Sequence, residues 1–171
     1  MSILLNLFIL LYLNLYMKNC YFFFLSVLMI SFKCLSQEKI KENHSYKIKK
    51  TDAEWKNELP KISYYVLRQS GTEYAFTGKY DDHYKEGVYK CMGCGADLYS
   101  SENKYNSRCG WPSFDKGEND NLEYSIDYSL GMIRTEIKCK NCGGHLGHLF
   151  NDGPKNTTGK RHCINSAALN F

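Results

Sequence analysis

The chain has 171 residues, 15% of them aromatic, and a formal net charge of +4. This length favours one domain, and the scarcity of proline, serine and acidic tracts excludes a largely disordered protein. Beyond residue 60, Gly, Asn and Asp recur at short intervals, which favours strands and turns over long helices. We therefore expect a mainly β domain.

Residues 1–36 differ from the rest because they contain no acidic residue and their apolar runs are split by Lys18. Read from Met17, the segment has a basic start, an apolar run over residues 21–32 and a small residue, Ser36, suited to the position before a cleavage. This pattern predicts a secretory signal peptide and an exported, periplasmic or extracytoplasmic protein.

Two other interpretations of the leader stay open. Read from Met1, the apolar stretch is long enough to cross a bilayer and serve as a retained anchor, although Lys18 would then lie near mid-membrane at a cost of about 2.5–3.5 kcal/mol. In the other interpretation, the segment results from an over-long gene model and the protein is not exported. Removal of the leader takes 2 of the 22 basic residues and leaves 20 against 18 acidic ones, which argues against a nucleic-acid partner.

Residues 37–50 are polar and mixed in charge, and we interpret them as a linker to a domain that spans residues 51–171. The first predicted element of this domain is a short amphipathic helix before Pro60. Thr51 or Asp52 is its N-cap, and Trp55 and Leu59 lie four residues apart.

The following segments alternate apolar runs with turns. Residues 62–91 contain several glycine-bearing turns, and residues 87–91 predict a strand that leads into a cysteine pair. Residues 121–139 repeat this arrangement, and a strand there would place Arg134 and Glu136 on one side and Thr135 and Ile137 on the other. Met132 would extend the first side and Ile133 the second.

Four cysteines form two C-x-x-C-G turns, CMGCG at Cys91 and Cys94 and CKNCGG at Cys139 and Cys142. Glycine after the second cysteine tolerates the positive φ that turns both sulfurs toward one ion, so the two turns together predict a tetrahedral, structural zinc site. The intervening 44 residues exceed the usual spacing of zinc ribbons. Two structural disulfides or a thioredoxin-like redox pair are the alternatives, although neither turn opens a helix in a βαβ pattern.

Cys109 and Cys163 are the two cysteines that remain once those of the leader and those of the two C-x-x-C-G turns are set aside. Cys163 lies in GKRHCINSAALNF, and as a strand this segment would place Arg161, Cys163 and Asn165 on one face and His162 and Ile164 on the other. Arg161 would lower the pKa of the Cys163 thiol and favour the reactive thiolate. The alternative is a half-buried cysteine beside a surface arginine.

Three further side chains are candidates for chemistry. His145 and His148 lie three residues apart in GGHLGHLFNDGP, as candidate proton donors, and Asp152 follows as a group that would orient a histidine or hold a water. Zinc ligation or simple packing is the alternative for both histidines. Trp111, held by the next proline in RCGWPSF, is either an apolar wall near Cys109 or an ordinary core residue.

Taken together, CMGCG, SRCGWPSF, GMIRTEIKCKNCGGHLGHLFNDGP and RHCINSAALNF resemble the B-type methionine sulfoxide reductases, which reduce the R epimer of methionine S-oxide. The resemblance runs from about Asp52 to Phe171 and includes EWKNELP and GTEYAFTG in family order. It implies an Mss4-like fold of two antiparallel sheets with short N-terminal helices. In many members a zinc ion bound to the two C-x-x-C knuckles clamps this fold.

The resemblance also implies a role for each candidate residue. Cys163 matches the catalytic nucleophile, Cys109 the resolving cysteine and Trp111 the wall that receives the substrate methyl group. The polar side of the pocket matches His145, His148, Asp152, Arg161 and Asn165.

The implied reaction reduces protein-bound and free methionine sulfoxide through a Cys163 sulfenic acid and a Cys109–Cys163 disulfide, which a thioredoxin-like dithiol recycles. Such a reductase repairs oxidised proteins. We expect a monomer that meets a membrane only through an uncleaved leader.

The chain departs from the family pattern at three positions. His162 stands where tyrosine is usual, Ala75 where proline precedes the phenylalanine, and Arg108 where glycine is frequent. The strand pattern places His162 on the face away from Cys163, so we expect little effect on the chemistry. Two rival functions are a zinc-ribbon binding module, which leaves Cys109, Cys163 and Trp111 without a role, and a thiol-disulfide oxidoreductase.

Overall fold

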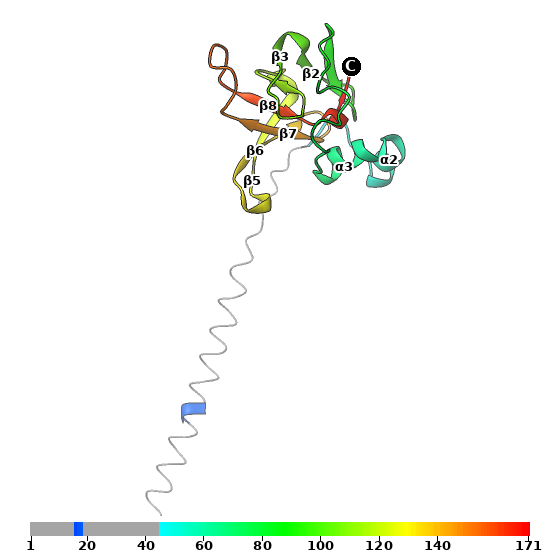
Figure 1. Ribbon diagram of the computed structural model, residues 1–171. Helices are drawn as coiled ribbons and strands as arrows, with labels where there is room; N and C mark the ends of the chain where they lie inside the picture. The colour runs from blue at the N-terminus through cyan, green and yellow to red at the C-terminus, as the bar shows by residue number, and fades with distance from the viewer. Residues whose placement is uncertain (1–15, 19–44) are drawn as a thin grey trace, which may run out of the picture. The chain divides into compact units, whose positions relative to one another are not determined.

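The structure is a computed structural model that describes residues 16–18 and 45–171 (Figure 1). The predicted signal peptide or anchor lies outside the described residues, apart from residues 16–18, which are helical. In the described ranges, no helix is long and apolar enough to cross a membrane. The compact C-terminal unit begins at Ser45, so the last residues of the predicted linker belong to it. There the Ile48 N–H donates a hydrogen bond of 2.9 Å to the Asn141 carbonyl.

The predicted first helix is present as α2, Asp52–Glu58. Thr51 is its N-cap, and Thr51 and Glu54 form a reciprocal capping box that satisfies the first free N–H groups. Trp55 and Leu59 are both buried, as their four-residue spacing predicts.

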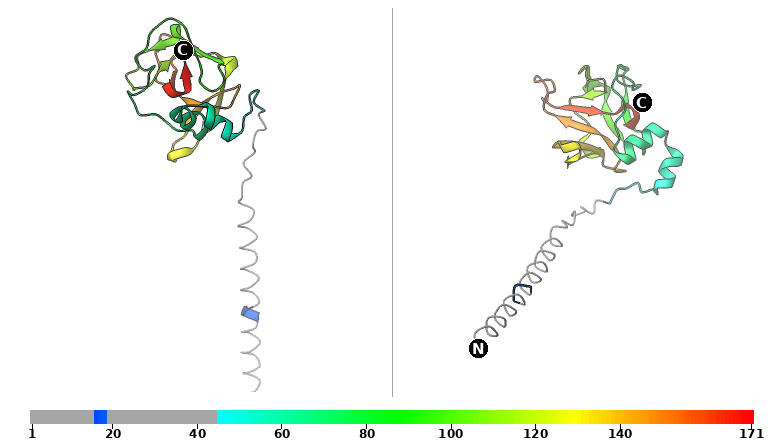
Figure 2. Two further views of the ribbon diagram at one scale, coloured as in Figure 1. Left: turned by 90° about the vertical axis from the view of Figure 1, so that its right-hand side faces the viewer. Right: turned by 60° about the horizontal axis from the view of Figure 1, so that its bottom comes forward.

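A second helix, α3, spans Lys61–Gln69. It lies in the stretch where the sequence pattern indicated only apolar runs and turns. Ser63, Val66 and Leu67 are its buried residues, at the spacing of three and four that defines one helical face. The helix ends at Ser70, whose φ of 53° is left-handed. Figure 2 shows α2 and α3 together on one side of the sheets, and α3 contacts strand β7.

Two antiparallel sheets form the rest of the described domain, which confirms the predicted fold class. The three-stranded sheet has the order β2-β1-β9, with β1 at Val88–Cys91, β2 at Asp97–Ser100 and β9 at Leu169–Asn170. The six-stranded sheet has the order β3-β4-β8-β7-β6-β5. Its strands are β3 Lys104–Tyr105, β4 Ser113–Phe114, β5 Leu122–Asp127, β6 Arg134–Cys139, β7 His145–Phe150 and β8 Arg161–Ile164.

The strand order brings the chain's C-terminal part to the middle of the larger sheet, where β8 pairs with β4 on one side and β7 on the other. Four short 3-10 turns join the elements: η1 Ser101–Asn103, η2 Asn119–Asn121, η3 Ser129–Gly131 and η4 Ser166–Ala168. The core behind β8 includes Tyr99, Phe114 and Leu146, all fully buried, and the ring of Tyr99 stacks on that of Phe114. Such packing leaves β8 little freedom to move.

Candidate active site and metal centre

Strand β8 carries the candidate nucleophile at the centre of the larger sheet. His162 and Ile164 are buried at 5% and 0% exposure, while Arg161 and Cys163 on the other face are partly exposed, as the period-two pattern predicts. Cys163 lies directly opposite Ser113 of β4 and His148 of β7 in the strand register. The sheet therefore sets a hydroxyl and an imidazole on either side of one sulfur.

Cys109 lies in the loop between β3 and β4, and its Sγ is 3.7 Å from the Sγ of Cys163. Both are free thiols. The Ser107 hydroxyl donates to Cys109 Sγ at 2.9 Å. Because disulfide sulfurs are about 2.05 Å apart, a small movement of this loop would bring the two sulfurs into bonding distance. The two cysteines left over in the sequence are thus neighbours in space.

The two sulfurs influence each other's ionisation. The hydrogen bond from Cys163, with smaller contributions from the Ser107 and Ser113 hydroxyls, lowers the pKa of Cys109 to about 4 against the opposing effect of burial. The same hydrogen bond and burial raise the pKa of Cys163, while Arg161 lowers it. The predicted effect of Arg161 is therefore present but is outweighed by Cys109 and by burial. The sequence pattern could not show that Cys109 lies so close to Cys163. The opposite directions of the two shifts mean that the negative charge of the pair is favoured on Cys109 over Cys163 while both sulfurs are reduced.

Cys163 opens onto a hollow of about 150 Å³, which we call the substrate hollow. Its lining residues are Thr72, Trp111, Arg134, Gly147, His148, Phe150, Cys163 and Asn165. Trp111 is held in place by a hydrogen bond of 3.2 Å from its indole N–H to the Glu73 carbonyl. The hollow thus joins an aromatic wall, a sulfur and an imidazole.

The two histidines occupy different positions. His148 lines the substrate hollow, and its Nε2 lies 2.9 Å from the Asp127 carboxylate, which also pairs with Arg134 at 2.6 Å. Burial lowers the pKa of His148, and the hydrogen bond with Asp127 opposes that effect. His145 lines an adjoining hollow that also contains His148, and its Nδ1 lies 2.7 Å from Glu136.

Asp152 does not orient a histidine as expected; it forms a bidentate pair with Arg161, at 2.8 Å for both hydrogen bonds, and Asp127 is the carboxylate that holds His148. Arg161 also stacks over the Phe150 ring, 4.4 Å from its centroid. This double support fixes the guanidinium on the Cys163 face of β8. The Arg161 charge is therefore held where a thiolate on Cys163 would form.

Asn165 is 4% exposed and acts as a bridge. Its Oδ1 accepts from the Glu73 N–H at 3.1 Å, and its Nδ2 donates to the Leu146 carbonyl at 3.0 Å. The buried Glu73 carboxylate in turn accepts from the backbone N–H groups of Ser166 and Ala167. Asn165 and Glu73 thereby tie the loop that supports Trp111 to the end of β8.

Sequence reasoning missed several residues of the site. Asp127, Arg134 and Glu136 hold the two histidines, and Glu73 holds Trp111 and Asn165. A signal was present for two of them, since the strand pattern placed Arg134 and Glu136 on one side of β6, and both line the hollow beside His148. Glu73 lies in a loop, where no periodic pattern marks it.

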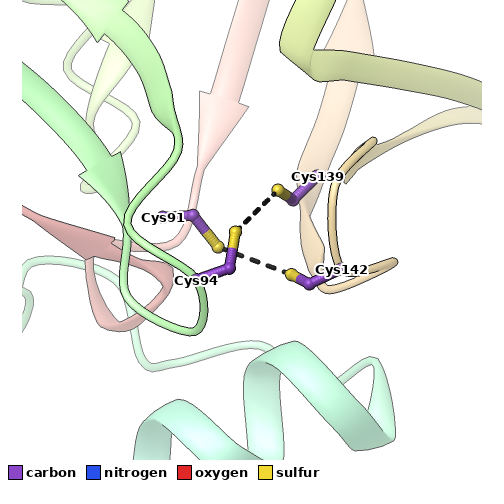
Figure 3. A group of neighbouring side chains, drawn as sticks. All are labelled: Cys91, Cys94, Cys139 and Cys142. Carbon is purple, nitrogen blue, oxygen red and sulfur yellow. Dashed lines mark hydrogen bonds between the residues drawn. The ribbon is translucent and has the colours of Figure 1, made fainter. Parts of the chain in front are cut away.

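The four knuckle cysteines converge on one point (Figure 3). The sulfurs of Cys91 and Cys142 are 3.7 Å apart and those of Cys94 and Cys139 are 3.5 Å apart, and all four lie within 4.8 Å of one another. Four sulfurs at about 2.3 Å from a tetrahedral zinc ion would lie about 3.8 Å from each other, so the spacing fits. The four cysteines are thus placed to hold one metal ion.

Each knuckle extends a strand from a different sheet, β1 in one and β6 in the other. The turns are alike: the Gly95 N–H bonds to the Cys91 carbonyl at 2.8 Å and the Gly143 N–H to the Cys139 carbonyl at 2.7 Å. Both glycines have positive φ, 74° and 70°, which confirms the predicted reason for glycine there. An ion in this site would clamp the two sheets together.

Comparisons with known proteins agree with this geometry. The model of the SelR domain matches residues 59–171. The chain is 50% identical over 126 residues to a peptide methionine sulfoxide reductase MsrB of Methylibium petroleiphilum, covering 73% of this chain and 91% of that protein. It is 48% identical over 131 residues to the protein of the same name in Burkholderia multivorans, covering 76% and 92%. It is also 48% identical over 139 residues to a probable methionine-R-sulfoxide reductase B of Caenorhabditis elegans, covering 80% and 90%.

Proposed function

The chain belongs to the SelR domain family and is a methionine-R-sulfoxide reductase, and we propose that it acts through Cys163 as nucleophile and Cys109 as resolving cysteine. The observation that carries this proposal is the distance of 3.7 Å between the two thiols, of which Cys163 lines the substrate hollow. Two thiols so placed provide both the attacking sulfur and the sulfur that closes the disulfide.

In this proposal the substrate side chain enters the substrate hollow with its methyl group against Trp111 and its sulfur facing Cys163. Apolar and sulfur-containing groups pack favourably on an aromatic face. The sulfoxide oxygen then faces His148, which lies opposite Cys163 in the β7–β8 register. We assign the proton donor to His148 rather than His145, because the substrate hollow is lined by the former.

The Cys163 thiolate attacks the sulfoxide sulfur while His148 delivers a proton to the oxygen, since the S–O bond breaks only when the oxygen no longer leaves as an anion. Arg161 stabilises the thiolate when the proton resides on Cys109. The protonated oxygen passes from the substrate sulfur to the Cys163 sulfur as the bond between the two sulfurs breaks, which releases methionine and leaves Cys163 as a sulfenic acid. In the resting site, Asp127 holds the His148 ring and Asp152 holds Arg161.

Cys109 then attacks the sulfenic sulfur of Cys163, a disulfide forms, and the oxygen leaves as water. A dithiol of the thioredoxin type reduces that disulfide and is itself oxidised to a disulfide. The overall reaction converts methionine sulfoxide and one dithiol into methionine, one disulfide and water. We propose that the substrate is methionine sulfoxide in proteins and also the free amino acid, and that the enzyme serves protein repair as a monomer.

The metal in the four-cysteine site is, in this proposal, a structural zinc ion held by Cys91, Cys94, Cys139 and Cys142. The tetrahedral sulfur spacing and the absence of a histidine or carboxylate among these four ligands support it. When bound, zinc crosslinks the sheets and takes no part in the reaction. The basic start and apolar run of the leader support export, with a retained anchor as the alternative.

The test uses both sulfoxide epimers with wild type, Cys163→Ser and Cys109→Ser. We expect wild type to reduce only the R epimer, and Cys163→Ser to release no methionine from it. Cys109→Ser should release about one methionine per protein and then stop with thioredoxin, because the sulfenic acid has no resolving thiol. Normal recycling of Cys109→Ser by thioredoxin would contradict the resolving role. Reduction of disulfide substrates without reduction of methionine sulfoxide would favour a thiol-disulfide oxidoreductase.

A further inference from the structure

The two reacting sulfurs open onto different hollows. Cys163 lines the substrate hollow with Trp111, and Cys109 does not. Cys109 lines a separate hollow of about 550 Å³, which we call the Cys109 hollow. Its other lining residues are Tyr105, Ser107, Arg108, Asp152, Gly153, Pro154 and Arg161. A second molecule can therefore approach Cys109 without entering the space that the methionine side chain needs.

Disulfide exchange at Cys109 would release Cys163 as the leaving thiolate. Arg161, which lies on the Cys163 face of β8 and is held by Asp152, is close enough to hydrogen-bond to that sulfur. Access through the Cys109 hollow therefore points to Cys109 as the sulfur that is attacked.

Arg108 stands between the Cys109 hollow and a smaller one of about 260 Å³, and it lines both. Its φ of 60° is left-handed, a conformation that is unfavourable for a residue with a side chain. The Asn106 carboxamide holds it there by accepting the Arg108 N–H at 2.9 Å. Residues held in such strained conformations cluster at functional sites.

The surroundings of Arg108 suit a protein partner. Among residues 45–171, Arg108 makes no ion pair within 4 Å, whereas Asp152 and Arg161 neutralise each other. Asp81 and Asp82 line the smaller hollow with it, beside Phe76 and Tyr84, whose side chains are 71% and 50% exposed. Exposed aromatics beside an unpaired arginine are typical of the residues enriched in protein interfaces.

We propose that Arg108 is a docking contact for the reductant, a protein dithiol that reaches Cys109 through the Cys109 hollow. This inference rests on the proposed function, which supplies the Cys109–Cys163 disulfide. One thiolate of the reductant bonds to Cys109 Sγ, the bond to Cys163 breaks, and Cys163 leaves as a thiolate. The second thiol of the reductant then attacks the mixed disulfide and releases the Cys109 thiolate. The reductant loses two electrons and two protons, which the two cysteines gain.

The first experiment identifies the attacked sulfur. The full-length protein is oxidised chemically to the Cys109–Cys163 disulfide, so that the measurement does not depend on methionine sulfoxide, and is mixed with a thioredoxin variant that lacks its second active cysteine. Mass spectrometry of the digested mixed disulfide should find thioredoxin joined to Cys109. A mixed disulfide on Cys163 would overturn the proposal.

The second experiment tests the Arg108 contact. Arg108→Asn keeps a residue that tolerates positive φ, and Lys56→Asn on exposed α2, which lines none of these hollows, is the matched control. We expect the KM for thioredoxin to rise about tenfold in Arg108→Asn, the low end of electrostatic effects on association, and to stay unchanged in Lys56→Asn. Recycling by dithiothreitol, which needs no docking surface, should be equal in all three proteins.

An unchanged KM for thioredoxin in Arg108→Asn would refute the contact. An equal loss with dithiothreitol would also refute it, because the residue would then act on the disulfide itself. Failure of the proposed function has a different signature, since the wild-type protein would release no methionine in a single turnover whatever the mixed disulfide shows.

Discussion

The partly buried carboxylate of Glu136 should contribute to stability in a pH range that can be calculated. It accepts hydrogen bonds from His145 at 2.7 Å and Lys138 at 3.0 Å, and its side chain is 13% exposed. Burial by itself raises the pKa of this group, but the hydrogen bonds from His145 and Lys138 lower it further, to about 2 against an ordinary value of 4.5. Because one pKa unit corresponds to about 1.4 kcal/mol, ionised Glu136 stabilises the folded state by about 3 kcal/mol.

The direction of this pH dependence follows from proton binding. Between pH 4.5 and about 2 the unfolded chain binds a proton at this position and the folded chain does not, so stability is fully present above pH 4.5 and is lost as the pH falls. About half of the contribution should be gone at about pH 3.5.

The perturbation is Glu136→Gln, measured by urea unfolding followed by tryptophan fluorescence between about pH 7 and 3.5. At neutral pH we expect the variant to be less stable than wild type by up to about 3 kcal/mol, and the gap to shrink to roughly half at the lower limit. Zinc release in acid affects both proteins, so the difference between the curves is the quantity measured. Glu86→Gln, at an exposed position, is the control. Curves that stay parallel over this range would refute the reasoning.

Two further predictions concern the metal and a buried histidine. Removal of the metal by a chelator should unfold the domain, because structural zinc contributes about 10 kcal/mol or more; circular dichroism melting curves check this, and an unchanged Tm after metal loss would contradict it. Burial lowers the pKa of His162 to about 4 from 6.5, so wild type should lose up to about 3 kcal/mol as the pH falls through that range. His162→Gln should lack this loss in the same urea assay, and an unchanged slope between pH 6.5 and 4.5 would count against a buried, neutral His162.

The parts of the site that the sequence predicts are those fixed by local chemistry. Two C-x-x-C-G turns need two left-handed glycines, and both are present at the end of a strand as expected. The helix at Asp52–Glu58 follows from its capping box and the spacing of its two buried residues. In each case the pattern and its physical cause lie within about ten residues of each other.

The contacts that the sequence does not predict depend on the strand order. Cys109 and Cys163 are 54 residues apart, and they meet because β4 pairs with β8. The separation of the two cysteines in the sequence does not show that they meet. Their pairing is predicted only by elimination and by the family resemblance. The raised pKa of Cys163 was beyond reach for the same reason, since its largest cause is a hydrogen bond across that distance. Glu73 was missed because its partners, Asn165 and Trp111, come from separate loops.

Alternate side chains of β8 face either the reacting groups or the core. Arg161 and Cys163 face the hollows where substrate and reductant would meet the sulfurs, while His162 and Ile164 are buried behind them. The His162 ring packs edge-on to Tyr99 and Tyr124, and its Nδ1 lies 3.2 Å from the Tyr99 hydroxyl. We therefore expect histidine in place of the usual tyrosine to change the acid stability of the domain and to leave the reacting face intact. The reverse holds for Arg108, which lies on the surface beside Cys109, so the departure that bears on function is the exposed one.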